Sequence, residues 1–185
     1  MSASLREKLE LPALAAAVLV TLGTMFAVPS WVGSMTEICR VAAMTAIVVM
    51  AIMVACRFLG ERGVLIERIT AALFLAGMPL VYVIRWLEVS RADAGTLALV
   101  GELVGVVIFG GLAFVGFRRA PWALVSGIAA HGIAWDAWHT GSRFMFDWYA
   151  IGCLACDVGL ASYLALRVPV WREARQEDRK LEVLA

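Results

Sequence analysis

One stretch of the chain concentrates side chains that could bind a metal ion or transfer protons. His131, Asp136 and His139 follow one another closely, and Asp157 lies in the next apolar segment. Imidazole and carboxylate groups are ligands for zinc and iron, and they also act as general acids and bases. In an α-helix the first three residues spread over roughly 140° of the surface and share one side. We therefore predict a catalytic or metal site, holding zinc or iron, made by His131, Asp136, His139 and Asp157.

Three interpretations fit this set of residues. A metal ion with an open position acidifies bound water, and a nearby carboxylate moves the proton, which would hydrolyse an amide or ester of a lipid. Without a metal, a carboxylic acid could protonate an alkene, as in the cyclisation of an isoprenoid, while Trp rings stabilise the cation. In the third interpretation His131 and Asp157, or Glu102, form a buried hydrogen-bonded pair that only fixes helix register.

Aromatic and basic side chains near this set would bind a substrate. Trp135 and Trp138 flank Asp136 and would line an apolar pocket or hold a cation. Arg85 either snorkels to the interface or, helped by Arg40, clamps a phosphate or carboxylate group. The predicted substrate-binding residues are Trp135, Trp138, Arg85, Arg40 and Glu102.

The elements that must position these residues are membrane-spanning helices. The chain has 185 residues, 62% hydrophobic and 17% charged, with a mean hydropathy of +0.85, whereas a soluble domain is nearer half apolar. About 20 apolar residues of helix cross a hydrocarbon core of about 30 Å. Six stretches are long enough: 11–28, 38–59, 69–86, 96–117, 122–139 and 148–168. We predict an all-α, polytopic, six-helix transmembrane bundle, with one domain over residues 1–170 and a charged tail over 171–185.

Basic residues and depth orient this bundle. With a cytoplasmic N-terminus most Lys and Arg fall on the cytoplasmic side, so both termini are predicted to be cytoplasmic. Glu67 and Arg68 then belong to an ordinary cytoplasmic loop. Counting about 1.5 Å per residue along the spans places Glu102, His131 and Asp157 at one level near mid-membrane. Because further polar residues lie above this level, we expect the site to open to the extracytoplasmic side.

Several classes of protein are excluded or disfavoured. A net charge of +1 and the lack of a basic patch exclude nucleic acid as a partner. The cysteines all lie inside spans, so they predict no secreted disulfide framework, and Cys153 and Cys156 are assigned a packing role. His131 and His139 share a helix and cannot both ligate one haem axially. Retinal chemistry needs a lysine within the membrane, and the chain has lysines only at 8 and 180.

The remaining tryptophans and a proline predict how the helices sit in the membrane, and two alanines suggest an alternative to an enzyme. Trp31, Trp86, Trp122, Trp148 and Trp171 fit belts at the two membrane interfaces, and Pro79 predicts a kink that opens a pocket. A binding or transport subunit of an importer is the main alternative to an enzyme. Its sequence hint is Ala13-x-x-x-Ala17, where small residues would dock a partner helix. A homo-oligomer is left open.

The segment His131-Gly-Ile-Ala-Trp135-Asp136-Ala-Trp-His139, followed by Trp148-Tyr149, Cys153 and Asp157, resembles a family of small uncharacterised bacterial multi-spanning membrane proteins. Their pattern is His, three residues, Trp-Asp, two residues and His, followed by a Trp-Tyr helix with Cys and Asp. Where that family commonly has a second His, this chain has Thr140. The resemblance covers the last two spans and implies that these residues form one unit. It also implies a bacterial protein of the inner (cytoplasmic) membrane.

A weaker similarity, of chemistry only, is to the alkaline ceramidase and adiponectin-receptor membrane hydrolases, which use His, Asp and Ser. Ser126 and the His/Asp set match that inventory. This chain departs from it by having six spans instead of seven and a different order of ligands. Together these features lead us to expect a membrane enzyme acting on a lipid or isoprenoid, by metal-dependent hydrolysis or metal-free acid–base chemistry.

Overall fold

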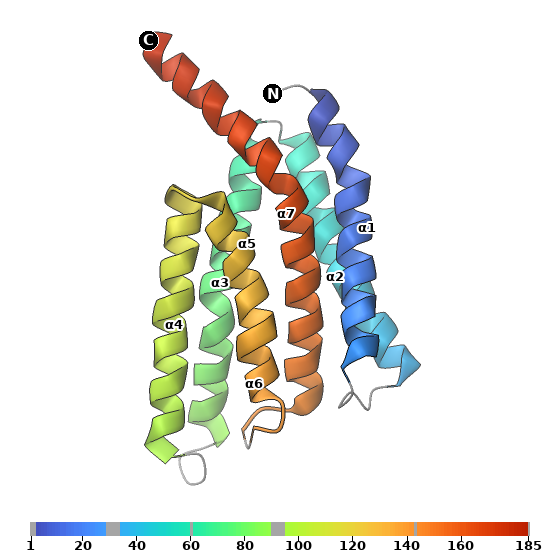
Figure 1. The fold of residues 1–185 in the computed structure, drawn as a ribbon, viewed down its shortest axis with the longest axis vertical. Coiled ribbons are helices and arrows are strands. Elements are labelled where there is room, and N and C mark those ends of the chain that lie inside the picture. The colour runs from blue at the N-terminus through green and yellow to red at the C-terminus, as the bar shows by residue number, and fades with distance from the viewer. Residues whose placement is uncertain (1–2, 29–33, 60, 90–94, 143, 185) are drawn as a thin grey trace.

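The computed structural model describes residues 3–28, 34–59, 61–89, 95–142 and 144–184, and every element in these ranges is helical. Trp31, predicted for an interface belt, lies outside the described residues. In chain order the elements are α1 (Ala3–Ala27), α2 (Met35–Phe58), α3 (Glu61–Val89), α4 (Gly95–Arg118), α5 (Pro121–Ala130), the π-helix η1 (His131–Asp136), α6 (Ala137–His139) and α7 (Asp147–Leu184) (Figure 1).

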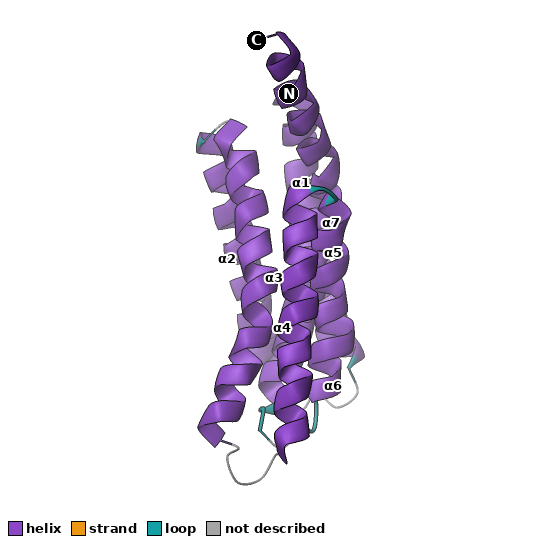
Figure 2. Cartoon of the chain, turned by 90° about the vertical axis from the view of Figure 1, so that its left-hand side faces the viewer, coloured by secondary structure: helices purple, strands orange, loops and turns teal. Residues whose placement is uncertain are grey.

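Within the described ranges, six helical passes make up the bundle, as the sequence predicts. Five helices, α1 to α4 and α7, are each long and apolar enough to cross a membrane. The remaining pass, fifth in chain order, is continuous from Pro121 to His139 through α5, η1 and α6. At about 1.5 Å per residue it has roughly the thickness of a hydrocarbon core. The passes lie side by side along a common long axis (Figure 2). Both ends of the chain lie at the same end of the bundle (Figure 1).

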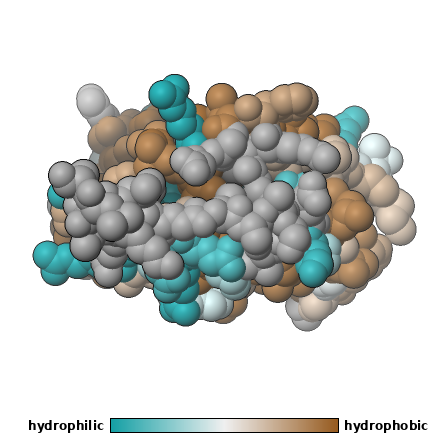
Figure 3. Space-filling model, turned by 90° about the horizontal axis from the view of Figure 1, so that it is seen from above, coloured by the Kyte–Doolittle hydropathy of each residue, from teal (hydrophilic) through white to brown (hydrophobic). Residues whose placement is uncertain are grey.

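The distribution of polarity is that of a membrane protein. Large apolar side chains face outward, including Leu19 (68% exposed) and Val107 (73% exposed), whereas ionisable side chains such as His131 and Asp157 are buried. Brown, apolar side chains form much of the rim when the bundle is seen from the end that carries the termini (Figure 3). Only lipid makes such an exterior stable. The chain is an all-α, multi-pass membrane protein.

Helix α7 lies at the centre of the bundle and packs most extensively on α1. A Cβ at Gly159 of α7 would collide with the side chain of Thr21 and approach the backbone of Ala17, so glycine permits this close approach. Ala13 and Ala17 are fully buried here. The sequence hint that these alanines dock a partner protein is therefore wrong, because they pack inside the chain.

A charged cluster at the end of the bundle that carries the termini corrects the predicted loop. Glu67 lies within α3 and is buried, and its carboxylate accepts hydrogen bonds from Tyr163 (2.6 Å), Arg167 (2.9 Å) and Trp171 (2.7 Å), all on α7. Neighbouring Arg68 donates to the carbonyl of Phe117. Trp171 is 1% exposed, so it lies in the interior and not in the predicted interface belt. Helix α7 continues unbroken through Leu184, so the predicted charged tail begins within this helix.

Candidate functional site

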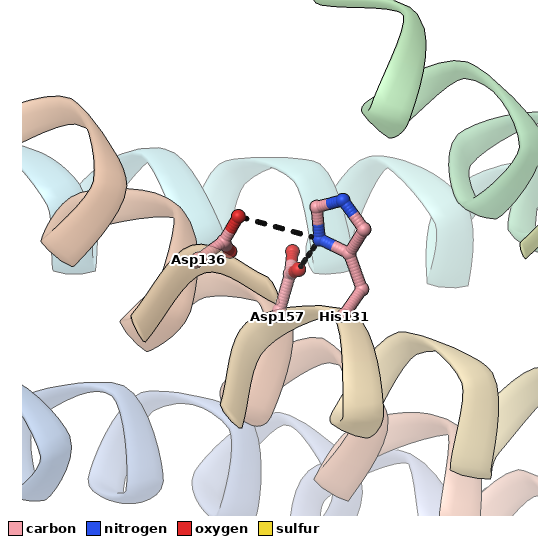
Figure 4. A group of neighbouring side chains, drawn as sticks. All are labelled: His131, Asp136 and Asp157. Atoms are coloured by element: carbon pink, nitrogen blue, oxygen red, sulfur yellow. Dashed lines mark hydrogen bonds and ion pairs between the residues drawn. The ribbon is translucent and has the colours of Figure 1, made fainter. Parts of the chain in front are cut away.

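Three of the predicted site residues meet in the interior of the bundle (Figure 4). The Nδ1 atom of His131 lies 2.8 Å from Oδ2 of Asp157 and 3.4 Å from Oδ1 of Asp136. All three side chains are at most 1% exposed. His131 and Asp136 belong to η1, and Asp157 comes from the antiparallel helix α7. The imidazole is therefore held between two carboxylates, away from the surface of the bundle.

The π-helix explains how His131 and Asp136 face the same partner. In an α-helix, residues five apart point about 140° apart, so they fall at the two edges of one side and do not face one partner directly. A π-helix closes its hydrogen bonds between residues i and i+5, so residues at this spacing lie roughly one turn apart on one face. Gly132 then lets α7 approach, because a Cβ there would lie 2.8 Å from Cβ of Asp157. Such short π segments are frequent at functional sites.

Tyr82 is a member of the site that sequence reasoning missed. It lies on α3, is 1% exposed, and its hydroxyl donates to Oδ1 of Asp136 over 2.6 Å. The one available signal was a polar-tipped side chain in the middle of an apolar span, close after Pro79. Helix α3 continues through Pro79. A third pass of the bundle thus contributes to the site.

His139 belongs to a different pair, which corrects the predicted ligand set and the predicted depth of Glu102. Its Nδ1 lies 2.7 Å from the carbonyl oxygen of Trp135, and its Nε2 lies 2.8 Å from Oε1 of Glu102. With both nitrogens engaged, His139 does not join His131. Glu102 accordingly lies at the level of His139, toward the end of the bundle opposite the termini.

The hydrogen bonds of His139 determine how many hydrogens the imidazole of His139 and the carboxyl group of Glu102 carry between them. A carbonyl oxygen only accepts, so Nδ1 of His139 carries a hydrogen. The 2.8 Å contact between Nε2 and Glu102 then needs one hydrogen as well. It resides either on the imidazolium or on the carboxylic acid, and the pair is neutral overall in both cases. Glu102 and His139 therefore share one proton in the interior.

The two predicted substrate-binding tryptophans have different surroundings. Trp135 is half-buried, packs edge-on against Phe109 at 5.6 Å between ring centroids, and covers Gly105 of α4. Its indole nitrogen is buried and has no hydrogen-bond partner among the described residues. Trp138 is 63% exposed and stacks edge-on against His139 at 5.1 Å. Trp135 thus belongs to the interior next to the site, and Trp138 to the outer face of the bundle.

The predicted arginine clamp is not assembled at the site. Arg85 donates from Nε to the carbonyl of Phe144 over 3.2 Å, pairs with Glu88 at 3.3 Å, and lies over the ring of Phe146 at 4.8 Å. These contacts anchor the loop before α7. Arg40 is exposed on α2. Arg85 therefore has a structural role that neither sequence interpretation identified.

Charge balance limits what the buried site can hold. Two carboxylates and one imidazole keep a net negative charge even when the imidazole is protonated. Burying an uncompensated charge costs several kcal/mol. An additional proton on one carboxylate, or a bound cation, therefore lowers the cost of burying the site at His131.

The donor atoms of His131, Asp136 and Asp157 can meet that need as a metal site. One ligand atom from each lies within 4.8 Å of the others. Zinc binds N and O ligands at about 2.0 to 2.2 Å, so three ligands must lie within roughly 4 Å of one another. The two distances from Nδ1 of His131, 2.8 Å to Asp157 and 3.4 Å to Asp136, already lie within this limit. The residues present fit a three-ligand site, with one position left for water or substrate.

A pocket of about 350 Å³ adjoins the site between α3 and α7. His131, Tyr82, Cys153 and Asp157 contribute to its wall, together with apolar side chains of α3. Leu73, at the edge of the pocket, is 68% exposed on the apolar exterior. The pocket is thus flanked by residues of the apolar exterior, and the predicted opening of the site to the extracytoplasmic side stays a prediction. A separate pocket of about 430 Å³ lies beside Glu102 and His139.

The Nε2 atom of His131 is the remaining functional group of the site. It is buried and has no hydrogen-bond partner among the described residues. Because Nδ1 faces the two carboxylates, Nε2 lies on the opposite edge of the ring (Figure 4). A carboxylate that holds Nδ1 and leaves Nε2 free is the arrangement of a general base.

Comparison with models of known protein families, with curated proteins and with solved structures finds no match, so the functional argument rests on this geometry.

Proposed function

We propose that this protein is an integral membrane enzyme that acts on a lipid or isoprenoid substrate at His131, Asp136 and Asp157, by hydrolysing an ester or amide bond. One observation carries the proposal: a buried histidine with an unpartnered Nε2 among the described residues, fixed by carboxylates on Nδ1, lines an apolar pocket. Since the pocket has lipid-facing residues at its edge, a substrate already dissolved in the bilayer suits it best.

Each polar residue then has a distinct task. Asp157 holds the Nδ1 hydrogen of His131, which leaves Nε2 to accept a proton from the attacking group and return it to the leaving group. Tyr82 orients Asp136 through the 2.6 Å hydrogen bond. Asp136 helps to stabilise the imidazolium that forms, because its carboxylate lies 3.4 Å from Nδ1.

The proposed setting is the inner membrane of a bacterium, with both termini in the cytoplasm. Support comes from the placement of the termini at one end of the bundle (Figure 1) and from the basic residues at that end, including Arg118, Arg119, Arg172 and Arg175. A fluorescent protein that matures only in the cytoplasm, fused after Ala185, would report this orientation. Absence of fluorescence from a well-expressed fusion would reverse it.

The test of the enzyme proposal uses purified protein in lipid nanodiscs, incubated with polar lipid and isoprenoid extracts of bacterial membranes. Mass spectrometry should find released acyl or isoprenoid products from the wild-type protein. Asp157→Asn, which loses the charge that orients His131, should slow release by about a hundredfold. Glu88→Gln is the matched control because Glu88 is 60% exposed. Equal rates for Asp157→Asn and wild type, or no product from any fraction, would refute the proposal.

A metal-dependent version is the second candidate, and the three converging donors favour it. A bound zinc or iron ion would supply acidified water and polarise the carbonyl group. Elemental analysis of the purified protein should then find one metal per chain, lost in Asp136→Asn. Because His139 lies with Glu102, His139→Ala should keep the metal. Protein that acts on lipid without a bound metal would eliminate this version and leave the acid–base version.

A further inference from the structure

The face of α7 that carries Asp157 also carries a thiol that the proposed function has not used. Cys153 precedes Asp157 by one turn, so the two side chains project from the same face of the helix. Cys153, His131 and Asp157 all line the pocket of about 350 Å³. Thiol, imidazole and carboxylate are thus present together beside one apolar cavity.

The imidazole of His131, which lines the same pocket, has one ring nitrogen left for such a thiol. Nδ1 of His131 lies 2.8 Å from the Asp157 carboxylate, while the fully buried Nε2 has no partner among the described residues. A nucleophile with a base beside it, and a third group orienting that base, is the general requirement for covalent catalysis.

The other groups at the pocket are less suited to be the nucleophile. Tyr82 already donates its hydroxyl to Asp136. Both thiols have a hydroxyl partner, since the sulfur of Cys156 lies 3.0 Å from Oγ1 of Thr45 and Cys153 hydrogen-bonds to the phenol of Tyr149. Cys156, one residue before Asp157, projects from a different face of α7. Tyr149 offers a phenol one turn further from Asp157. Cys153 combines a thiol, the strongest nucleophile among these groups, with the position nearest to the Asp157 face.

We infer that Cys153 is the nucleophile of the proposed enzyme and that its substrate is a lipid with an ester- or amide-linked fatty acyl chain. This inference rests on the proposed function in its acid–base version. It assigns to Cys153 a covalent role in place of the packing role that the sequence suggested.

The reaction balances as two proton-neutral steps. Nε2 of His131 takes the thiol proton, the sulfur forms a bond to the acyl carbon, and the bond from that carbon to the lipid oxygen or nitrogen breaks. The leaving group takes the proton from Nε2. Water then gives a proton to Nε2, forms the bond to the acyl carbon and releases the thiolate, which recovers its proton. The net products are a fatty acid and the deacylated lipid.

A lipid-soluble alkylating agent tests this assignment in the full chain. We would treat the protein in nanodiscs with a long-chain alkyl iodoacetamide and follow modification by mass spectrometry, in a Cys156→Ser background so that the α7 peptide has one thiol. Cys153 should react, and His131→Gln should slow the reaction by about tenfold or more. Cys39, exposed on α2, is the internal control and should react equally in both proteins. Equal rates at Cys153 would overturn the inference.

A second variant separates this inference from the proposed function and avoids reliance on His131→Gln folding. Cys153→Ser keeps the size of the side chain, and it should abolish release of fatty acid from lipid while the protein stays folded. Full release by Cys153→Ser, combined with loss of release in Asp157→Asn, would refute the nucleophile and retain the enzyme. Full release in both variants would refute both proposals.

Discussion

At the residue scale, the two histidines of the chain differ in which ring nitrogen remains available. His139 uses Nδ1 for a backbone carbonyl and Nε2 for Glu102, so it has no lone pair or hydrogen left for a substrate. His131 uses only Nδ1 among the described contacts. Hydrogen bonding therefore assigns the chemistry to His131, although the sequence makes both residues equally attractive.

The shared proton of Glu102 and His139 leads to a prediction about stability. Glu102→Gln can donate its amide hydrogen to a neutral His139, so the free energy of unfolding should change by less than about 1 kcal/mol. Glu102→Ala leaves Nε2 buried without a partner and should cost about 1 to 3 kcal/mol. Thermal unfolding in detergent measures both, with exposed Glu88→Ala as the control. If the glutamine variant is as unstable as the alanine variant, the pair depends on the full carboxylate charge.

The observed site consists of His131, Asp136, Asp157 and Tyr82, and the sequence predicts all of these except Tyr82. It does so because charged side chains inside apolar spans are rare and need partners. His131, Asp136 and Asp157 are found together for that reason. The partner of His139 was not predictable, since Glu102 lies 37 residues away on another helix. Counting depth from span ends put Glu102 at the wrong level, because that count ignores how far neighbouring helices are shifted along their axes.

At the element scale, the π-helix and the close contact of η1 with α7 create the site. The sequence locates the fifth pass well, with 122–139 predicted and Pro121 to His139 observed. The change to π hydrogen bonding within it was not predictable, because apolar periodicity over a few residues does not distinguish the two helix types. Gly132 lies within this π segment, where η1 packs closely on α7.

Gly132 provides a test of this arrangement. A Cβ there would lie 2.8 Å from Cβ of Asp157 and 3.1 Å from the carbonyl oxygen of Leu154, so Gly132→Ala should push η1 away from α7. We expect the free energy of unfolding to fall by about 1 to 3 kcal/mol and lipid product to decrease. Gly110→Ala is the matched control, since nothing lies within 4 Å of its Cβ, and it should be neutral or stabilising by up to about 1 kcal/mol. Equal effects of the two variants would contradict the close-contact argument.

At the scale of the whole molecule, charged groups are buried at both ends of the bundle, while apolar groups cover its exterior. The site at His131 lies between the Glu102–His139 pair and the Glu67 cluster. Composition and charge predict the number of passes and the multi-pass fold. They could not predict the Glu67 cluster, because Glu67 and Arg167 are 100 residues apart and each is typical of a membrane interface by itself.

The Glu67 cluster should hold α7 against α3 at the end that carries the termini, and the ion pair makes this testable. Arg167→Met removes the cation from a buried carboxylate and should lower the free energy of unfolding by about 3 to 5 kcal/mol. Glu67→Gln combined with Arg167→Met leaves no buried charge in this pair, while the amide oxygen introduced at position 67 can still accept from Tyr163 and Trp171, so most of that loss should be recovered. Reversible unfolding in mixed micelles of the single and double variants measures the coupling. If the double variant is as unstable as the sum of the single variants, Glu67 and Arg167 act independently, and the attachment of α7 to α3 depends on apolar packing such as that of Trp171 rather than on charge.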